Sequence, residues 1–189
     1  MGVCDRGEYG RVEKGFNVLQ AGAGGMILAN TQEQGADIVS DTHCLPGIHI
    51  DSDQGDALRT WLATGNGHSG RITATDRVLD GSLADQVVAS SSRGPNPEIA
   101  GVVKPNLMAP GANIIGASSD ETMVAFLTGT SMASPHIAGS AALLLGVNPS
   151  WSPDIVQSTM ETTASHDVIQ DGADLAPINT RGAGLVQPS

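Results

Sequence analysis

The sequence predicts an α/β protein, and three observations lead to this fold class. Glycine supplies 24 of the 189 residues while aromatic residues make up only 3%, a balance that favours tight turns and close backbone packing. Residues 12–29 read as a helix, a glycine-rich turn and a short apolar strand, which together form an αβ unit. Residues 132–145 are almost uncharged, and a helix that is apolar on most of its circumference is usually buried.

The elements of the first region follow from the spacing of their apolar residues. Apolar side chains at 12, 16 and 19 recur at helical spacing, and the glycines that follow end this helix. Residues 26–29 are an apolar run typical of a buried strand. Isoleucines alternate with histidines around residues 48–50, which predicts another strand, and residues 57–62 predict a short helix that closes the region.

A polar, glycine-rich stretch at residues 64–70 marks a boundary between two regions. Beyond it, residues 71–80 alternate weakly and predict a strand, and residues 87–89 are a further short apolar run. Residues 113–117 follow a Pro-Gly turn and predict a buried strand.

Two helices stand out in the second region. The first covers the apolar residues 132–145, with its bulk concentrated in three consecutive leucines. The second begins at Ser152, which is suited to cap the helix, with Pro153 at the first helical position and Asp154 in the first turn.

Composition excludes several classes of function. Nine basic against twenty acidic residues give a net charge of −11, and without a basic cluster we expect no nucleic-acid partner. No window approaches the roughly 18 consecutive apolar residues that a membrane span needs, so we expect no membrane association. The first residues lack a signal-peptide pattern, which for a complete protein points to the cytoplasm and for a fragment carries no information.

The two cysteines leave one question open. Neither Cys4 nor Cys44 belongs to a CxxC pair, which makes a zinc site improbable. They can form one disulfide in an oxidising compartment or remain free thiols, and the sequence does not decide between these alternatives.

The strongest chemical motif is Gly-Thr-Ser-Met-Ala-Ser-Pro-His at residues 129–136. It lies where a loop meets the predicted apolar helix, so Ser131 stands near unpaired N–H groups at the positive end of a helix dipole. A serine hydroxyl placed in this way can serve as a nucleophile once a base activates it. The plainer alternative is an ordinary serine that caps a helix.

This octapeptide, followed by Ile-Ala-Gly, resembles the signature around the nucleophile of subtilisin-like serine proteases, the subtilases. Further segments resemble the same family: Ser-Ser-Arg-Gly-Pro at 91–95, Lys-Pro-Asn-Leu-Met-Ala-Pro-Gly at 104–111, Asn-Pro-Ser-Trp-Ser-Pro at 148–153 and Gly-Ala-Gly-Leu-Val, a glycine-rich strand in the family, at 182–186. Asn106 is a departure, because the family often has an aspartate there. The resemblance covers roughly residues 85–189 and implies the C-terminal part of a subtilisin-like three-layer domain with a parallel sheet.

The first region is similar to the protease-associated (PA) domain that some subtilases carry as an insert. The segments that resemble it are Cys-Asp-Arg-Gly at 4–7, Lys-Gly at 14–15, the run at 21–30 and Asp-Thr-His-Cys-Leu-Pro at 41–46. We therefore predict that residues 1–66 are the C-terminal part of a PA domain and residues 67–189 the C-terminal part of the catalytic domain.

The resemblance also implies what this chain lacks. In subtilases the catalytic triad follows the order Asp, His, Ser, and the Asp-Ser/Thr-Gly and His-Gly-Thr contexts and the oxyanion Asn lie upstream of a PA insert; none of these contexts occurs here. Asp41 and His68 precede Ser131 in the right order, but triads are defined by geometry and not by order. We expect Asp41 to belong to the PA-like segment, His68 to a flexible linker, and His136 to a structural position turned away from Ser131.

No metal or cofactor is expected. His43, His49 and His166 have no partners at metal-ligand spacing and read as ordinary polar positions. Asp51, Asp53 and Asp56 fail the EF-hand pattern and read as a solvated acidic turn.

The resemblance implies a segment of a secreted serine endopeptidase that cleaves protein or peptide substrates through an acyl-enzyme on Ser131. We expect the isolated chain to be inactive and to need the N-terminal part of the catalytic domain as its partner. Because the strands that cover the nucleophile helix in the family come from upstream, we also expect self-association. The alternative function is a non-catalytic module in which the PA-like region binds peptide or mediates assembly, and cleavage specificity cannot be told from the sequence.

Overall fold

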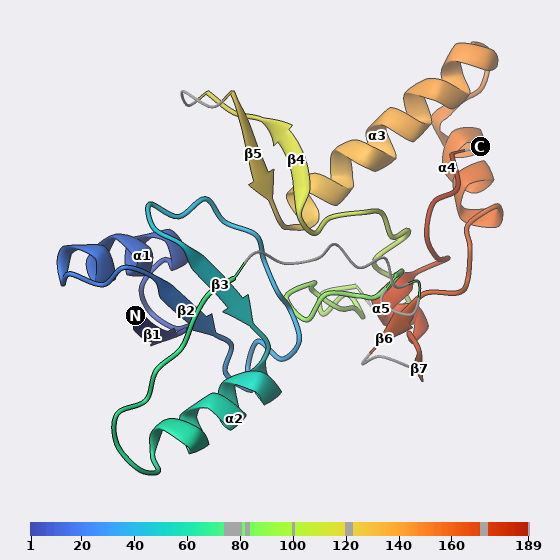
Figure 1. Cartoon of the computed structure of the whole chain (residues 1–189). Helices are drawn as coiled ribbons and strands as arrows, with labels where there is room; N and C mark the ends of the chain where they lie inside the picture. Colours follow the sequence, from blue (N-terminus) through green and yellow to red (C-terminus); the bar gives the residue numbers. More distant parts are fainter. Residues whose placement is uncertain (74–80, 82–83, 100, 120–122, 171–173, 189) are drawn as a thin grey trace. The chain divides into compact units, whose positions relative to one another are not determined.

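The computed structural model describes residues 1–73, 81, 84–99, 101–119, 123–170 and 174–188 (Figure 1). The chain divides into two compact units. Unit 1 comprises residues 1–78 and 115–126, and unit 2 comprises residues 79–114 and 127–189.

Unit 1 contains a three-stranded parallel sheet in the order β1 (Gly2–Asp5), β2 (Met26–Ala29) and β3 (Gly47–Ile50). Its register places Ile27 of the central strand between Val3 and Ile48. Helix α1 (Arg11–Gln20) connects the first two strands, which makes a βαβ unit. The α/β class predicted from the sequence is confirmed, as are the two strands and both helices predicted in this region, although the second helix begins earlier than predicted and covers Ser52–Leu62. Strand β1 was not predicted.

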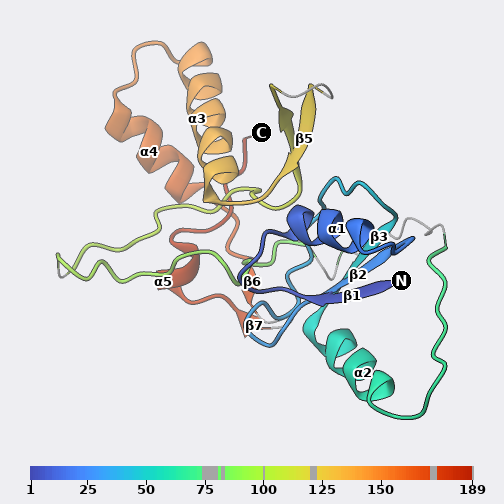
Figure 2. The same ribbon diagram turned by 90° about the vertical axis from the view of Figure 1, so that its left-hand side faces the viewer.

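The two helices of unit 1 cover opposite faces of this sheet (Figure 2). Met26 and Leu28 of the central strand are buried with Leu45, and the partly buried Val18 of α1 packs against this cluster. On the other face Ala29 meets α2 (Ser52–Leu62), where a Cβ at Gly55 would lie only 3.3 Å from the Ala29 Cβ. The central strand is therefore buried on both sides, as is usual for parallel sheets.

Unit 2 is built around a helical pair, α3 (Thr130–Val147) and α4 (Pro153–Thr162). Both helices were predicted, and Ser152 caps the second, since its hydroxyl accepts a hydrogen bond from the Ile155 N–H at 3.4 Å. The rest of the unit consists of the short antiparallel pair β6 (Ile169–Gln170) and β7 (Asp174–Leu175) and of α5 (Ile178–Arg181).

Two small cores hold unit 2 together. Val156 and Met160 of α4 pack with Val186 and with half-buried residues of α3, while Val87, Val168 and Ala176 form a separate cluster. The predicted glycine-rich strand at 182–186 is reduced to single bridges from Leu185 to Met108 and to Ser165.

Two sequence predictions about burial are wrong for this chain. The strand predicted at 113–117 exists as β4 (Ile114–Ala117), which pairs with β5 (Val124–Leu127), but Ile115 is 65% exposed. Helix α3 is largely exposed as well, with Leu143 65% accessible and Ser140 its one buried residue. An apolar pattern identifies side chains that are expected to be buried. In the described structure, many of these side chains in β4 and α3 are not covered by other residues.

Three further expectations from the sequence concern a strand at residues 71–80, the two cysteines and membrane-spanning helices. Of the strand expected at 71–80, residues 74–80 lie outside the described part, and 71–73 are irregular. Cys4 and Cys44 are both free thiols in this structure. Among the helices that the structure describes, none combines the length and apolarity needed to cross a bilayer.

Candidate active site

The nucleophile motif begins at a glycine that is locked against a neighbouring loop in unit 2. The Gly129 N–H donates to the Gly111 carbonyl oxygen at 2.8 Å, and the Asn113 N–H donates to the Thr128 Oγ1 at 2.9 Å. A Cβ at Gly111 would lie 2.9 Å from the Gly129 carbonyl oxygen and 3.3 Å from the Ala133 Cβ. Only glycine therefore permits this close approach, which fixes where α3 starts.

Ser131 is the second residue of α3, and it is exposed. Gly129 occupies the N-cap position and has no side chain with which to cap the helix. The N–H groups of Met132 and Ala133 donate to the Gly129 carbonyl oxygen, which leaves those of Thr130 and Ser131 at the positive end of the helix dipole. The first turn carries no acidic residue that would offset this potential. The hydroxyl is accessible to a substrate carbonyl, and nearby N–H groups can stabilise an oxyanion.

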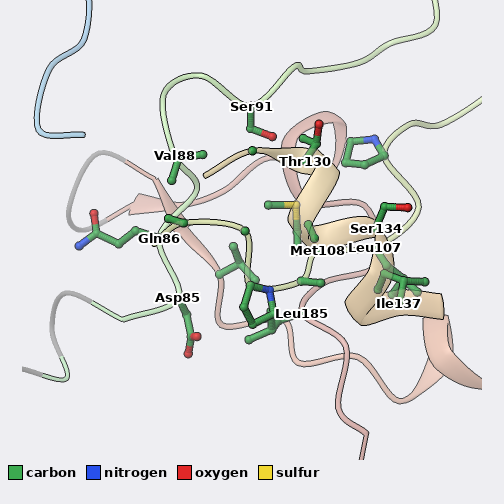
Figure 3. Close-up of a pocket in the computed structure, with 18 of the residues that line it drawn as sticks. Asp85, Gln86, Val88, Ser91, Leu107, Met108, Thr130, Ser134, Ile137 and Leu185 are labelled. Atoms are coloured by element: carbon green, nitrogen blue, oxygen red, sulfur yellow. The ribbon is translucent and has the colours of Figure 1, made fainter. Parts of the chain in front are cut away.

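An apolar cavity of about 450 Å³ lies beside the first turns of α3, entirely within unit 2 (Figure 3). Thr130, Ser134 and Ile137 line it from the helix, and Leu107 and Leu185 are among the lining residues outside the helix. These three helical positions recur at i, i+4 and i+7 and so share one face. Ser131 lies about 100° further round the helix and is not part of the lining.

His136 makes a contact with its own helix. Its Nδ1 lies 2.7 Å from the Met132 carbonyl oxygen, which requires a proton on Nδ1 that the imidazole donates. The ring is thus engaged with the backbone one turn back, in agreement with the structural position predicted for it.

The residues of the hypothetical compact triad have partners of their own in unit 1. The Arg11 guanidinium donates to both carboxylate oxygens of Asp41, at 2.5 and 2.9 Å. His68 packs edge-on against Trp61, with ring centroids 4.3 Å apart. Asp41 is thus engaged by Arg11 within unit 1, whereas the buried Nε2 of His68 has no hydrogen-bond partner among the described residues.

The acidic residues near α2 also have structural roles. Asp51 caps the helix by accepting the Gln54 N–H at 2.8 Å. Asp56 accepts from Arg59 at 2.8 Å and from Gln32 at 2.7 Å, and these hydrogen bonds, that of Arg59 first, lower the pKa of the Asp56 carboxyl. Within the described ranges, no group of three or more His, Cys, Asp or Glu side chains is placed to hold a metal ion.

The three histidines that read as ordinary polar positions in the sequence have different surroundings in the structure. His166 is exposed, and the His43 ring lies against Gly15 with its Nδ1 buried and without a hydrogen-bond partner. His49 is half-buried and hydrogen-bonded on both ring nitrogens, to Asn30 and to Val39. Its alternation with two isoleucines indicated a strand, but nothing in the local pattern identified these partners.

The family model and similar relatives among known proteins all match the chain to the same family. Residues 23–184 match the model of the subtilase family. The chain is 39% identical to subtilisin-like protease SBT1.7 of Arabidopsis thaliana over 207 residues, which cover 99% of this chain and 27% of that protein. It is 36% identical to subtilisin-like protease SBT1.4 and 37% identical to SBT5.4 of the same plant, with 99% of this chain covered in each case. The chain thus spans about a quarter of the length of these relatives.

Proposed function

The chain belongs to the subtilase family, and from this premise we propose that it is the nucleophile-bearing segment of a serine endopeptidase. The observation that carries the proposal is the exposed Ser131 in the first turn of α3, inside the family's Gly-Thr-Ser-Met-Ala-x-Pro-His signature. The α/β structure with its parallel sheet fits the subtilisin-like fold. In the proposed division, residues 1–66 derive from a PA domain and residues 67–189 from the catalytic domain.

The proposed reaction is hydrolysis of a peptide bond in two steps. The Ser131 Oγ bonds to the carbonyl carbon of the scissile peptide while its proton passes to a histidine encoded upstream of this chain. The C–N bond then breaks, and the departing amine takes that proton. Water attacks the acyl-enzyme in the same way, which releases the new carboxyl group and restores the serine hydroxyl.

The chain contributes the nucleophile and its placement, and we propose that the remaining groups come from the rest of the protein. Among the described residues, none forms a hydrogen bond that would activate the Ser131 hydroxyl, and the sequence contains no family context for the triad Asp, the triad His or the oxyanion Asn. Loss of triad members in subtilisin itself costs about 10⁶-fold in kcat. The isolated chain is therefore inactive under this proposal, and the full-length protein is a secreted protease.

An active-site probe tests the proposal directly. A fluorophosphonate should label the full-length protein, and Ser131→Ala should abolish that labelling, whereas the matched control Ser134→Ala, three residues along the same helix, should retain it. The isolated chain should stay unlabelled. Strong Ser131-dependent labelling of the isolated chain would contradict its inactivity, and labelling of full-length Ser131→Ala would remove the nucleophile role.

The exposed apolar surface of α3 supports the proposal of a missing partner. Leu143 and Val147 are 65% and 77% exposed, and exposed apolar surface of this kind marks an interaction site. In the absence of the upstream part, we propose that the chain self-associates through this surface. Light scattering should show a mass above that of one chain, and a monomer that melts cooperatively would contradict this.

The second candidate function is a non-catalytic interaction module. Unit 1 favours it, because this unit forms its own three-stranded sheet and core. A full-length protein that resists the probe but still binds peptide would support this alternative.

A further inference from the structure

The connection between β2 and β3 in unit 1 contains a segment that is neither helix nor strand. It is bound mainly by side chains, with backbone bonds near its start, among them one from the Ser52 N–H to the Gly35 carbonyl oxygen at 3.0 Å. We call residues 35–43 the strap. From residue 37 to 43 its positions alternate between half-buried and exposed, as expected for an extended chain with one inward face. The inward positions are bound by side chains from the ends of β1 and β2, from α1 and from β3.

Asn30, the residue after β2, determines which atoms of this network donate hydrogen bonds and which accept them. Its side chain is completely buried, and its Nδ2 donates to the carbonyl oxygens of Gly35 and Asp37, both at 2.9 Å. With both amide protons used, its Oδ1 must accept, and it receives the Arg6 Nη1 at 3.3 Å and the His49 Nε2 at 2.7 Å. His49 therefore carries a proton on Nε2 in either charge state.

The other nitrogen of His49 faces both backbone groups of Val39 in the strap. The Val39 N–H lies 3.2 Å from Nδ1, and the Val39 carbonyl oxygen lies 3.0 Å from it. A neutral ring accepts the N–H through the lone pair on Nδ1. A protonated ring loses this acceptor and donates to the carbonyl instead, so the charge state of one side chain decides which Val39 group is bonded.

The surroundings of His49 disfavour its charged form. Burial lowers the pKa of His49, the hydrogen bond to the Val39 backbone raises it, the charges of Arg6 and Arg11 lower it further, and Asp41 opposes them; the net direction is downward. The charged side chains of the network are Arg6, Arg11, Arg59, Asp37 and Asp41. Protonation thus adds a positive charge to a half-buried ring that already lies near two arginines.

We propose that His49 is a pH-dependent switch in the strap: protonation of its Nδ1 breaks the hydrogen bond from the Val39 N–H and replaces it with one to the Val39 carbonyl oxygen. Because the folded state disfavours the charged ring, the stabilising contribution of His49 is complete above the ordinary histidine value of about 6.5 and is lost as the pH falls below it through the lowered pKa. The Val39 N–H then loses its acceptor, whereas Asn30 still binds Gly35 and Asp37 and Arg11 still binds Asp41, so the rest of the strap stays attached. This inference does not depend on the role of Ser131.

Hydrogen exchange of the full chain tests the switch. The Val39 amide should lose protection as the pH falls from about 7.5 through the range below about 6.5, after correction for the intrinsic pH dependence of exchange, while α2 peptides keep theirs. His49→Gln, which can still donate to Asn30 and accept from Val39 but cannot titrate, should show pH-independent protection. The control His166→Gln changes an exposed histidine and should behave like the parent. Equal loss in parent and His49→Gln, or no loss in the parent, would overturn the proposal.

A second measurement on the unaltered chain keeps the proposal testable should His49→Gln not fold. In NMR titrations the His49 ring should titrate below the value of an exposed histidine, and the Val39 amide should shift with the same midpoint. A His49 ring that titrates at or above the ordinary value, or a Val39 amide that does not follow it, would refute the switch.

Discussion

Asn106 occupies a position where the family often has an aspartate, and the structure shows what this amide does here. Its Nδ2 donates to the Glu161 Oε1 of α4 at 3.0 Å, and its Oδ1 accepts from the Lys104 ammonium group. The same Glu161 oxygen accepts the Gln157 amide at 2.7 Å. The loop that leads to Gly111 is therefore tied to α4 by a donor that an aspartate does not possess.

Asn106→Asp should destabilise the chain at neutral pH. The substitution removes a hydrogen bond to a charged acceptor, worth about 1.5–3 kcal/mol, and places two carboxylates in contact. Two unit charges about 4 Å apart near a protein surface repel by about 4 kcal/mol before screening, which partial exposure reduces strongly. A stronger attraction between the new carboxylate and the Lys104 ammonium group offsets at most about 1 kcal/mol of this destabilisation. We expect a net loss of about 2 kcal/mol, or about 4–8 °C in Tm for a chain of this size.

Thermal or urea unfolding of both proteins measures this effect. Parent and variant should differ at pH 7 and converge under acidic conditions, because protonation of either carboxyl removes the repulsion. The double variant Asn106→Asp with Glu161→Gln should regain most of the stability, since a glutamine can donate to the new carboxylate. If Asn106→Asp is as stable as the parent at pH 7, or if Glu161→Gln does not rescue it, then the contact with Glu161 does not hold this loop.

Other substitutions test the packing around the nucleophile helix and the C-terminal loop. Gly111→Ala, whose Cβ would press on the Gly129 carbonyl oxygen at 2.9 Å, should cost about 1–3 kcal/mol in unfolding free energy and reduce probe labelling of the full-length protein; undiminished labelling would contradict this. Gly184→Ala should cost about 3 kcal/mol or more, because φ is +132° there and a Cβ would overlap the Ser165 carbonyl oxygen; a wild-type Tm would argue against that contact. Ser152→Ala should cost about 1 kcal/mol by removing the α4 cap, measured by urea unfolding, and no change would mean that water replaces the cap.

Several features were predictable because their signals are local. Residues 26–29 are apolar without interruption, and Ser152 is followed by proline and aspartate, so a strand and a helix start could be predicted where the structure has them. The octapeptide at 129–136 likewise indicated a helix start beside a loop. The burial expected for α3 was wrong in this chain because a pattern shows that a surface is apolar, whereas exposure depends on what packs against it.

Features that depend on distant pairing were not predictable. Gly2–Asp5 has no strand pattern of its own and becomes β1 by pairing with β2 more than twenty residues later. The contact between Gly111 and Gly129 joins two loops, and neither local sequence indicates the other. Likewise, His43, His49 and His166 read as ordinary polar residues until the fold placed His49 between Asn30 and Val39.

The sequence by itself determined the family, the α/β class and the candidate nucleophile, because motifs and apolar periodicity are carried by neighbouring residues. Only the tertiary structure decided that Ser131 is accessible, that Asp41 is bound by Arg11, and that His49 contacts Val39 in the strap. Burial, hydrogen-bond partners and pKa direction arise from groups far apart along the chain, and their positions are set only when the backbone folds.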